Sequence, residues 1–265
     1  MTSAKKISSA ENPRYRSIVK LRESSRERRK AGRSLLDGVH LVAAYLEHGG
    51  RPEALVVSES ARGDAEIAQL MARYGGDALV LADGLFRDLS SVATPTGIIA
   101  VIETPRPPAL PSSPGACVML EDVQDPGNVG SILRSAAAAG VEEIYLSRGS
   151  VHAWSPRVLR AGMGAHFALR IHEAVDLAAL VKRYAGRVLA AARSGGAPVF
   201  EADLRGHVAL LFGNEGAGLT RALESAADQI VHIPMPGVAE SLNVAAAAAV
   251  CLFERVRQEA VTGQR

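Results

Sequence analysis

The stretch Ile230-Val-His-Ile-Pro-Met-Pro-Gly-Val-Ala-Glu-Ser-Leu-Asn243 is the most informative part of the sequence. A short apolar run ends at Ile233, two prolines turn the chain, and an Ala/Val-rich segment then predicts a helix near residues 242–258. Polar Ser241 and Asn243 stand where that helix begins, and serine is a preferred N-cap. Because the first N–H groups of a helix have no partner inside it, this place can hold a polar ligand.

Upstream of this stretch, short apolar strands alternate with helical segments, which predicts an α/β fold with a parallel sheet. Aliphatic residues dominate and aromatic residues make up only 4% of the chain, a composition that suits helices packed closely on such a sheet. In the second half we expect a helix near residues 129–139 and strands at residues 116–121, 143–146, 187–192, 208–212 and 229–233.

The first half also alternates short apolar strands with helical segments, which predicts a small, parallel-leaning sheet. A helix is expected from Pro13 to about Lys30, followed by strands at residues 35–37, 54–57, 78–81 and 97–102 and helices near 39–47, 64–74 and 84–89. Prolines crowd residues 103–114, which show neither a helix nor a strand pattern. We therefore expect an N-terminal domain at residues 1–103, a linker at 104–114 and a second domain at 115–265.

Positive charge is concentrated at one end of the chain. Residues 1–34 contain eleven Lys and Arg against three Glu, a net charge of +8, so the remainder carries −6 of the chain's total of +2. Such a concentration is the electrostatic footprint of a protein that binds a phosphate backbone. The alternative is a solvated helical face with a loose tail, and the charge alone does not separate the two.

Cys117 and Cys251 both stand among apolar residues, without His or Cys at ligand spacing. We interpret them as small core residues and expect neither a disulfide nor a metal site. No apolar run is long enough to span a bilayer, and the N-terminus lacks the apolar core of a signal peptide. A cytoplasmic location is expected.

Two further segments carry residues suited to ligand binding. In Asp125-Pro-Gly-Asn-Val-Gly-Ser-Ile-Leu-Arg134 a turn feeds a helix, and Asn128 and Arg134 reach one site only if the loop folds back. The alternative is an Asn cap with an exposed helical Arg. Leu210-Leu-Phe-Gly-Asn-Glu-Gly-Ala-Gly218 ends a strand in a Gly-rich turn that is neither a dinucleotide fingerprint nor a phosphate loop. A tight strand–helix turn would explain it equally well.

Together and in this order, the three segments resemble the motifs of the SpoU (TrmH) family of RNA 2′-O-ribose methyltransferases, in the SPOUT superfamily. The matching residues are Asn128, Gly130 and Arg134, then Gly213, Glu215, Gly216 and Gly218, then Ile233, Pro234, Met235, Ser241, Leu242 and Asn243. Residues 35–42, 94–101 and 155–164 resemble other parts of the family. The resemblance therefore covers nearly the whole chain.

This resemblance implies a C-terminal α/β domain with a trefoil knot, a homodimer, and a smaller N-terminal α/β domain that binds RNA. S-adenosylmethionine is the implied methyl donor. Catalytic roles are implied for Asn128, Arg134, Glu215, Ser241 and Asn243. Contacts with the methyl donor are implied for Ala190, Ala191, Ala192, Gly213, Asn214, Ile233, Met235 and Leu242.

The implied reaction is methyl transfer to a ribose 2′-hydroxyl in structured RNA, with ribosomal RNA favoured and transfer RNA as the alternative. A catalytically silent RNA-binding protein, such as a ribosome assembly factor, is an alternative from another class. A small-molecule methyltransferase would leave the basic N-terminus unexplained. Because a guanidinium stays protonated in proteins, we expect Arg134 to act as an electrostatic clamp rather than as a base. The sequence does not specify the modified nucleotide.

Overall fold

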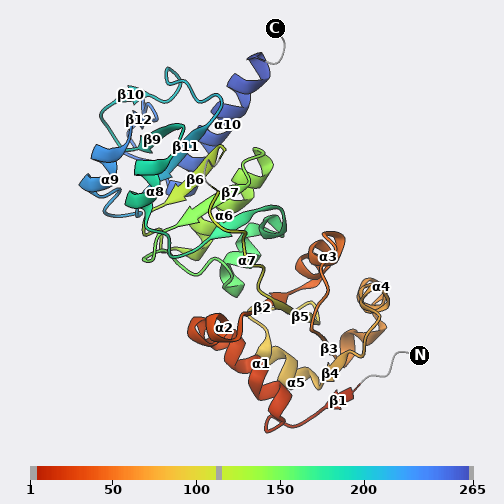
Figure 1. Cartoon of the computed structure of the whole chain (residues 1–265). Helices are drawn as coiled ribbons and strands as arrows, with labels where there is room; N and C mark the ends of the chain where they lie inside the picture. Colours follow the sequence, from red (N-terminus) through yellow and green to blue (C-terminus); the bar gives the residue numbers. More distant parts are fainter. Residues whose placement is uncertain (1–4, 112–114, 263–265) are drawn as a thin grey trace. The chain divides into compact units, whose positions relative to one another are not determined.

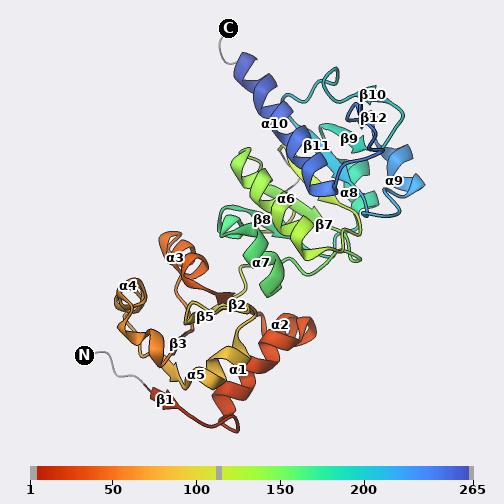
Figure 2. The same cartoon turned by 180° about the vertical axis from the view of Figure 1, so that it is seen from behind.

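The computed structural model describes residues 5–111 and 115–262, and it divides the chain into two compact units (Figures 1 and 2). The first unit contains the chain up to Pro105 together with Trp154–Phe167, and the second contains Arg106–Ala153 and the chain from Ala168 onwards. Residues 154–167, expected in the second domain, thus group with the first unit. The end of the expected linker, residues 112–114, lies outside the described residues.

The first unit is built on a five-stranded sheet in the order β1-β4-β3-β5-β2. Its strands are β1 (Lys5–Ile7), β2 (Arg33–Asp37), β3 (Ala54–Ser58), β4 (Leu79–Leu81) and β5 (Ile98–Glu103). Its helices are α1 (Pro13–Glu23), α2 (Ser25–Ala31), α3 (Val39–Glu47), η1 (Ser60–Gly63), α4 (Ala65–Tyr74), α5 (Asp83–Leu89) and α7 (Pro156–Gly162). The helix η2 (Ala165–Ala168) reaches the boundary between the units. Apolar residues of α1 and α5 pack on one face of the sheet.

The prediction of a parallel-leaning sheet in the first half is only partly right, because the sheet is mixed. β1, β4 and β3 are parallel, whereas β5 pairs antiparallel with both β3 and β2. A fully buried strand appears in the sequence as a continuous apolar run, and such a run carries no information about strand direction. The strand β1, with one apolar residue in three, was not predicted.

The single helix predicted from Pro13 to Lys30 is two helices. Ser24 has an extended backbone (φ −123°, ψ 116°), so α1 ends before it. The Ser24 hydroxyl then accepts the backbone N–H of Glu27 at 3.2 Å and caps α2. Serine competes with helix hydrogen bonds through its own side chain, which explains a break that the periodicity of charged residues did not indicate.

Arg28 does not belong to the exposed basic surface that the charge count suggested. It is 4% exposed, and its guanidinium donates to the carbonyls of Leu21 and Arg22 and to Ser25 Oγ. Burial, with a smaller repulsion from Arg29, lowers its pKa. Its carbonyl partners lie in the last turn of α1, where the helix dipole favours a cation. Arg28 therefore stabilises the junction between the two helices.

The second unit is built on a seven-stranded sheet in which every pair is parallel, in the order β10-β12-β9-β11-β6-β7-β8. Its strands are β6 (Cys117–Leu120), β7 (Glu143–Leu146), β8 (Arg170–His172), β9 (Arg187–Ala191), β10 (Ala197–Pro198), β11 (Val208–Phe212) and β12 (Gln229–His232). Its helices are α6 (Pro126–Ala138), α8 (Leu177–Arg183), α9 (Arg221–Ala226) and α10 (Val244–Thr262). The parallel α/β fold predicted for this half is confirmed.

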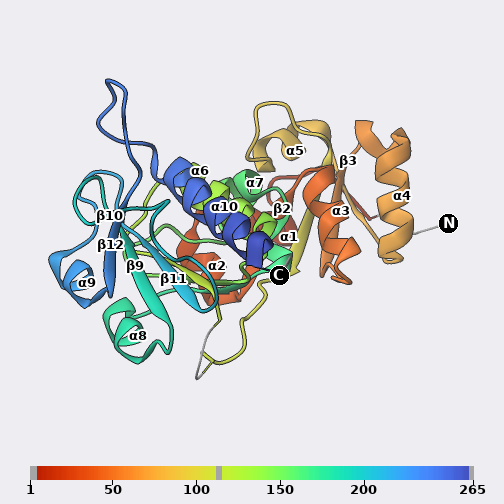
Figure 3. The same ribbon diagram turned by 90° about the horizontal axis from the view of Figure 1, so that it is seen from above.

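Helices cover both faces of this sheet (Figure 3). α6 and α10 pack against each other on one face, and α8 and α9 lie on the other over a core that includes Met119, Tyr145 and Leu211. Both cysteines are buried, as predicted. Among the described residues, no helix is long and apolar enough to cross a membrane, and no three His, Cys, Asp or Glu side chains are grouped to hold a metal ion. The knot stays a prediction.

Candidate functional site

The three motif segments meet at one edge of the seven-stranded sheet. Because β6, β11 and β12 point the same way, the loops that follow them leave the sheet on the same side. The first motif follows β6, the second follows β11 and the third follows β12. The chain leaves β6 toward β7 and returns as β9 and β11 on the other side of β6. Open α/β sheets bind their ligands at such a reversal of strand order.

A chain of side-chain hydrogen bonds joins the three motifs. Asn243 Nδ2 donates to Asn128 Oδ1 at 2.8 Å, and Asn128 Nδ2 donates to Glu215 Oε1 at 2.9 Å. The Glu215 carboxylate also accepts the backbone N–H groups of Asp125 at 3.0 Å and Gln124 at 3.3 Å. Because an ionised carboxylate only accepts, it determines which end of the Asn128 amide faces it. The three motifs are therefore held in one fixed arrangement.

The surroundings of Glu215 keep its carboxyl group ionised. Burial alone would raise the pKa of Glu215, but hydrogen bonds from the Asn128 side chain and from the backbone N–H groups of Glu215, Asp125 and Gln124 together lower it from the ordinary value of 4.5. A carboxylate with a lowered pKa, and with its oxygens already occupied, is a poor general base at neutral pH. Glu215 is suited to holding other residues in place.

We expect Glu215→Gln to lower the free energy of unfolding by about 1 kcal/mol at neutral pH, because an amide offers donors where Asn128 and Asp125 already donate. The pKa of Glu215 in the folded protein lies below 4.5, so its contribution is present above pH 4.5 and is lost as the pH falls through the folded value. Urea unfolding of both proteins across this range measures the difference. A difference that stays constant through the acid range would contradict this role.

The N-cap of α10 is Asn243, whereas the sequence suggested Ser241. Asn243 Oδ1 accepts the backbone N–H of Ala245 at 2.9 Å and that of Ala246 at 3.4 Å. Asn and Ser are about equally good N-caps, so the sequence alone did not distinguish two candidates spaced two residues apart. The Asn243 side chain thus caps α10 with its oxygen and donates a hydrogen bond to Asn128 with its nitrogen.

The turn after β11 brings two backbone segments into direct contact. A Cβ atom on Gly213 would lie 2.2 Å from the carbonyl carbon of Gly218, so no side chain fits there. Asn214 and Gly218 exchange two backbone hydrogen bonds, of 3.0 and 2.9 Å. The Asn214 side chain also donates to the Asp122 carbonyl at 2.8 Å. This closed turn positions Glu215 opposite Asn128.

A cavity of about 580 Å³ opens beside this hydrogen-bonded chain. Most of the residues predicted to bind the methyl donor or to act in catalysis line it: Ala191, Ala192, Gly213, Asn214, Glu215, Ile233, Met235, Ser241, Leu242 and Asn243. Asn128 is bonded to two of them, Glu215 and Asn243. The buried Cys251 forms part of the wall, and burial raises the pKa of its thiol to about 12, so it presents a neutral surface.

Two predicted site residues do not line this cavity. Ala190 is fully buried in the core under α8 and α9, because neighbouring strand residues point to opposite faces and Ala191 takes the side of the cavity. Arg134 lies on α6, six residues after Asn128 and therefore on another face of the helix. Its side chain is exposed and makes no hydrogen bond or ion pair with any described residue.

Arg193 and His232 line the cavity although neither was among the predicted site residues. Arg193 Nη2 donates to the carbonyls of Gly216 at 2.7 Å and Glu215 at 3.1 Å. These two hydrogen bonds stabilise the backbone of the second motif. His232 Nδ1 lies 2.9 Å from the Gly195 carbonyl oxygen. Both residues stand at the carboxyl ends of parallel strands, β9 and β12. That position was the one signal in the sequence that could have identified them.

The cavity fits a nucleoside that carries a cationic sulfonium. Its volume lies within the range of small-molecule sites. Phe212, Val231 and Leu242 supply apolar walls, while Glu215 and Glu224 supply carboxylates that favour a cation. Gly213 lines the wall as bare main chain, and its missing Cβ lets the backbone of Gly218 close the turn behind it. The residues present therefore suit S-adenosylmethionine.

Residues 115–253, more than half of the chain, match the SpoU rRNA Methylase family. The chain belongs to this family. Residues 12–100 of this SpoU-family protein match the MRM3-like substrate binding domain. The assignment to the SpoU family suggested by the three motifs is thus confirmed.

Relatives of this SpoU-family protein include 23S rRNA methyltransferases that match it over almost their whole length. The 23S rRNA (guanosine(2553)-2′-O)-methyltransferase RlmP of Bacillus subtilis is 31% identical over 251 residues, which cover 94% of this chain and 98% of that protein. The 23S rRNA (uridine(2479)-2′-O)-methyltransferase of Streptomyces viridochromogenes is 30% identical over 270 residues, covering 97% and 93%. The crystal structure of an AdoMet-bound rRNA methyltransferase from Sinorhizobium meliloti has a TM-score of 0.83 at 30% identity, covering 97% and 98%.

Proposed function

We propose that this SpoU-family protein methylates a ribose 2′-hydroxyl in ribosomal RNA with S-adenosylmethionine as the methyl donor. The observation that carries the proposal is the hydrogen-bonded chain Asn243–Asn128–Glu215 beside a cavity of about 580 Å³ at the carboxyl ends of the parallel strands. The named rRNA 2′-O-methyltransferase relatives support the reaction and the substrate class.

The methyl donor would be held by the cavity-lining residues Ala191, Ala192, Gly213, Ile233, Met235 and Leu242. When bound, S-adenosylmethionine supplies an electrophilic methyl group on a sulfonium. Asn128, Glu215 and Asn243 keep the walls of the cavity in register, so that the acceptor oxygen meets a preorganised site. The exposed Ser241 also lines this cavity and would contact the acceptor nucleotide.

Arg134 would bind the acceptor nucleotide through its phosphate and the oxygen that develops negative charge. Within one subunit it does not line the cavity, so we propose that the protein acts as a homodimer in which Arg134 completes the partner's site. The apolar side chain of Phe253 on α10 is 48% exposed, which supports a subunit contact along this helix.

The N-terminal domain, residues 1–103, would capture the RNA through its basic residues, and residues 115–265 would form the knotted catalytic domain. The match of residues 12–100 to a substrate binding domain supports this division. We also propose a cytoplasmic location, which the bacterial rRNA methyltransferase relatives support.

Transfer of a labelled methyl group from S-adenosylmethionine to separated ribosomal and transfer RNA pools that lack the modification tests the proposal. We expect alkali-resistant label in ribosomal RNA, because a methylated 2′-oxygen blocks cleavage of the adjacent phosphodiester. Arg134→Ala should give almost none. Label in transfer RNA would reassign the substrate. Binding of the methyl donor without transfer to either pool would favour a silent RNA-binding protein.

A further inference from the structure

The cavity beside the three motifs has a charge pattern opposite to that of S-adenosylmethionine. Among the described residues that line it, the charged Asp, Glu, Lys and Arg side chains are Glu215, Glu224 and Arg193. The methyl donor carries a sulfonium, an ammonium and, at the end of its methionine part, a carboxylate. The wall therefore offers carboxylates for the two cations of the ligand and a single guanidinium for its one anion.

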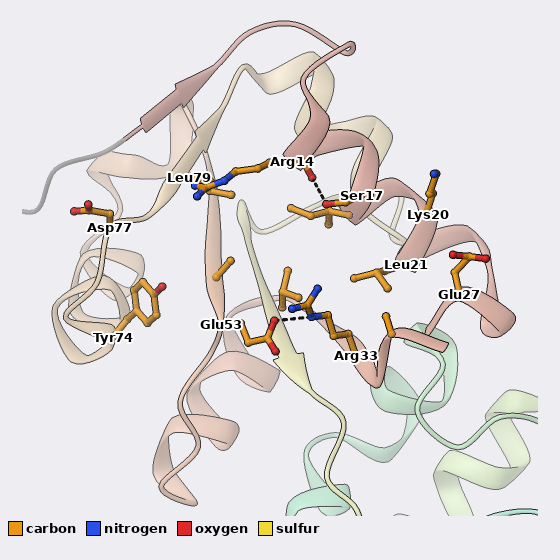
Figure 4. Close-up of a pocket in the computed structure, with 14 residues that line it drawn as sticks. Arg14, Ser17, Lys20, Leu21, Glu27, Arg33, Glu53, Tyr74, Asp77 and Leu79 are labelled. Atoms are coloured by element: carbon orange, nitrogen blue, oxygen red, sulfur yellow. Dashed lines mark hydrogen bonds and ion pairs between the residues drawn. The ribbon is translucent and has the colours of Figure 1, made fainter. Parts of the chain in front are cut away.

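The cavity under α1 in the first unit lacks such a pattern (Figure 4). Cations and carboxylates line it in equal number, namely Arg14, Lys20 and Arg33 with Glu27, Glu53 and Asp77. Arg33 Nε lies 2.6 Å from Glu53 Oε2, a contact that Figure 4 draws as a dashed line. Charges of both signs balance there, so that lining does not select a ligand by its charge.

Arg193 lies at the end of the first-named cavity where methyl transfer would take place. Its Nη2 donates to the backbone carbonyls of Glu215 and Gly216. The Glu215 side chain is hydrogen-bonded to Asn128, which in turn binds Asn243, and the acceptor would lie beside these side chains. The sulfonium has to lie at this end for its methyl group to reach the acceptor. A short carbon chain joins that sulfur to the carboxylate, so the carboxylate comes within reach of Arg193.

The guanidinium of Arg193 keeps both its charge and several donors available. It has five N–H groups, and the structure gives partners only to those of Nη2. Both partners are neutral carbonyl groups, and Arg193 makes no ion pair with any described residue. The N–H groups of Nε and Nη1 can therefore form charge-assisted hydrogen bonds to a carboxylate.

The loop that carries Arg193 is fixed against the neighbouring strand β12. His232 Nδ1 lies 2.9 Å from the Gly195 carbonyl oxygen. A side chain on Gly196 would collide with the Ile230 carbonyl, so the loop lies directly on that strand. A cation on a fixed loop loses less conformational entropy when it binds a ligand than one on a free loop does.

We propose that Arg193 binds the carboxylate of the methyl donor and so selects a nucleoside with an intact methionine end. The inference rests on the proposed function, in which this cavity holds the methyl donor. Without Arg193, the charged side chains of the lining would be Glu215 and Glu224 alone, and they would repel the carboxylate of the ligand. Arg193 is thus a specificity-determining residue for the methyl donor.

The test compares two unreactive ligands in calorimetric titrations. S-adenosylhomocysteine lacks the transferable methyl group, and its decarboxylated analogue lacks the carboxylate as well but keeps the amine. Arg193→Met removes the guanidinium and keeps a long side chain, whereas Arg193→Lys keeps the positive charge. The matched control is Arg221→Met, which removes the same charge from an exposed position of α9 that does not line the cavity.

The wild-type protein should bind S-adenosylhomocysteine about tenfold more tightly than the decarboxylated analogue, because the analogue loses a hydrogen bond between charged groups. Arg193→Met should bind the two ligands alike, Arg193→Lys should recover part of the preference, and Arg221→Met should keep all of it. A purely structural role of Arg193 would weaken both ligands equally and leave the preference unchanged. That outcome overturns the proposal, as does a wild-type protein without preference.

Chemical modification of arginine in the wild-type protein gives a measurement that no variant's folding can affect. Phenylglyoxal reacts with exposed guanidinium groups, and mass spectrometry identifies the modified residues. With each ligand at saturation, we expect S-adenosylhomocysteine to protect Arg193 more strongly than the decarboxylated analogue does. Equal protection by the two ligands would refute the assignment.

Methyl transfer and ligand preference report separately on the proposed function and on Arg193. The expected preference without methyl transfer to any RNA would remove the proposed function alone. Methyl transfer together with a wild-type preference in Arg193→Met would remove the role of Arg193 alone. If that variant raises the KM for RNA while its ligand preference stays, the guanidinium binds the RNA backbone and the proposal is likewise overturned.

Discussion

Gly213→Ala is expected to destroy the cavity that we propose holds the methyl donor. The new Cβ would lie 2.2 Å from the carbonyl carbon of Gly218, 2.3 Å from the nitrogen of Leu219 and 2.4 Å from the oxygen of Gly218, all of which are backbone atoms. Because backbone cannot move aside as a flexible side chain can, the turn must open. We expect a loss of about 3 kcal/mol in the free energy of unfolding, together with loss of measurable S-adenosylmethionine binding.

Gly216→Ala is the matched control for this prediction. It lies in the same turn, and a Cβ there would meet only Asn214 Oδ1, at an ordinary 3.5 Å. Urea unfolding and calorimetric titration with S-adenosylmethionine should show a near-normal protein. If Gly213→Ala binds the methyl donor as well as Gly216→Ala does, the close backbone contact is not required for the site.

Arg134→Ala should lower kcat by about a hundredfold or more, as loss of one preorganised donor to a developing oxyanion does. Since Arg134 does not line the cavity of its own subunit, the affinity for S-adenosylmethionine should stay unchanged. Arg134→Lys keeps the charge but loses the planar fork, so it should recover only part of the rate. Single-turnover methyl transfer and equilibrium binding of the methyl donor measure the two quantities separately.

Arg183→Ala is a suitable control, because Arg183 is exposed on α8, on the face of the sheet opposite α6. It should leave kcat unchanged. Near-normal turnover of Arg134→Lys would contradict the clamp role, because it would show that a single positive charge is enough for the reaction. A parallel loss of methyl-donor affinity in Arg134→Ala would show instead that the residue supports the cavity itself.

Much of the second unit follows from its sequence because parallel strands covered on both faces appear as continuous apolar runs. The strands near Cys117–Leu120 and Val208–Phe212 are wholly buried and were found for that reason. The short edge strand Arg170–His172 was missed, since only one of its three residues is apolar. In the first unit, the direction of β5 was not recoverable, because strand direction depends on tertiary pairing and not on local pattern.

The site was predictable where a motif combined a turn with a polar side chain, as at Asn128, Glu215 and Asn243. It was not predictable where the role depends on which face of an element a residue occupies. Ala190 and Ala191 are adjacent and identical, yet one lies in the core and the other at the cavity. Arg193 binds two carbonyl groups across the cavity edge, and an exposed arginine after a strand carries no sequence signal for such contacts.

The hydrogen bonds that join Asn243, Asn128 and Glu215 determine when the site can form during synthesis on the ribosome. Synthesis runs from the N-terminus, so β6 emerges early, and its neighbour β11 follows only about a hundred residues later. Asn128 can bind Glu215 only after that second motif is synthesised, and the third partner, Asn243, follows later still. A nascent chain that stops short of Asn243 lacks one wall of the cavity. The site therefore forms only after Asn243 has been synthesised, well after the strand β6 that carries the first motif.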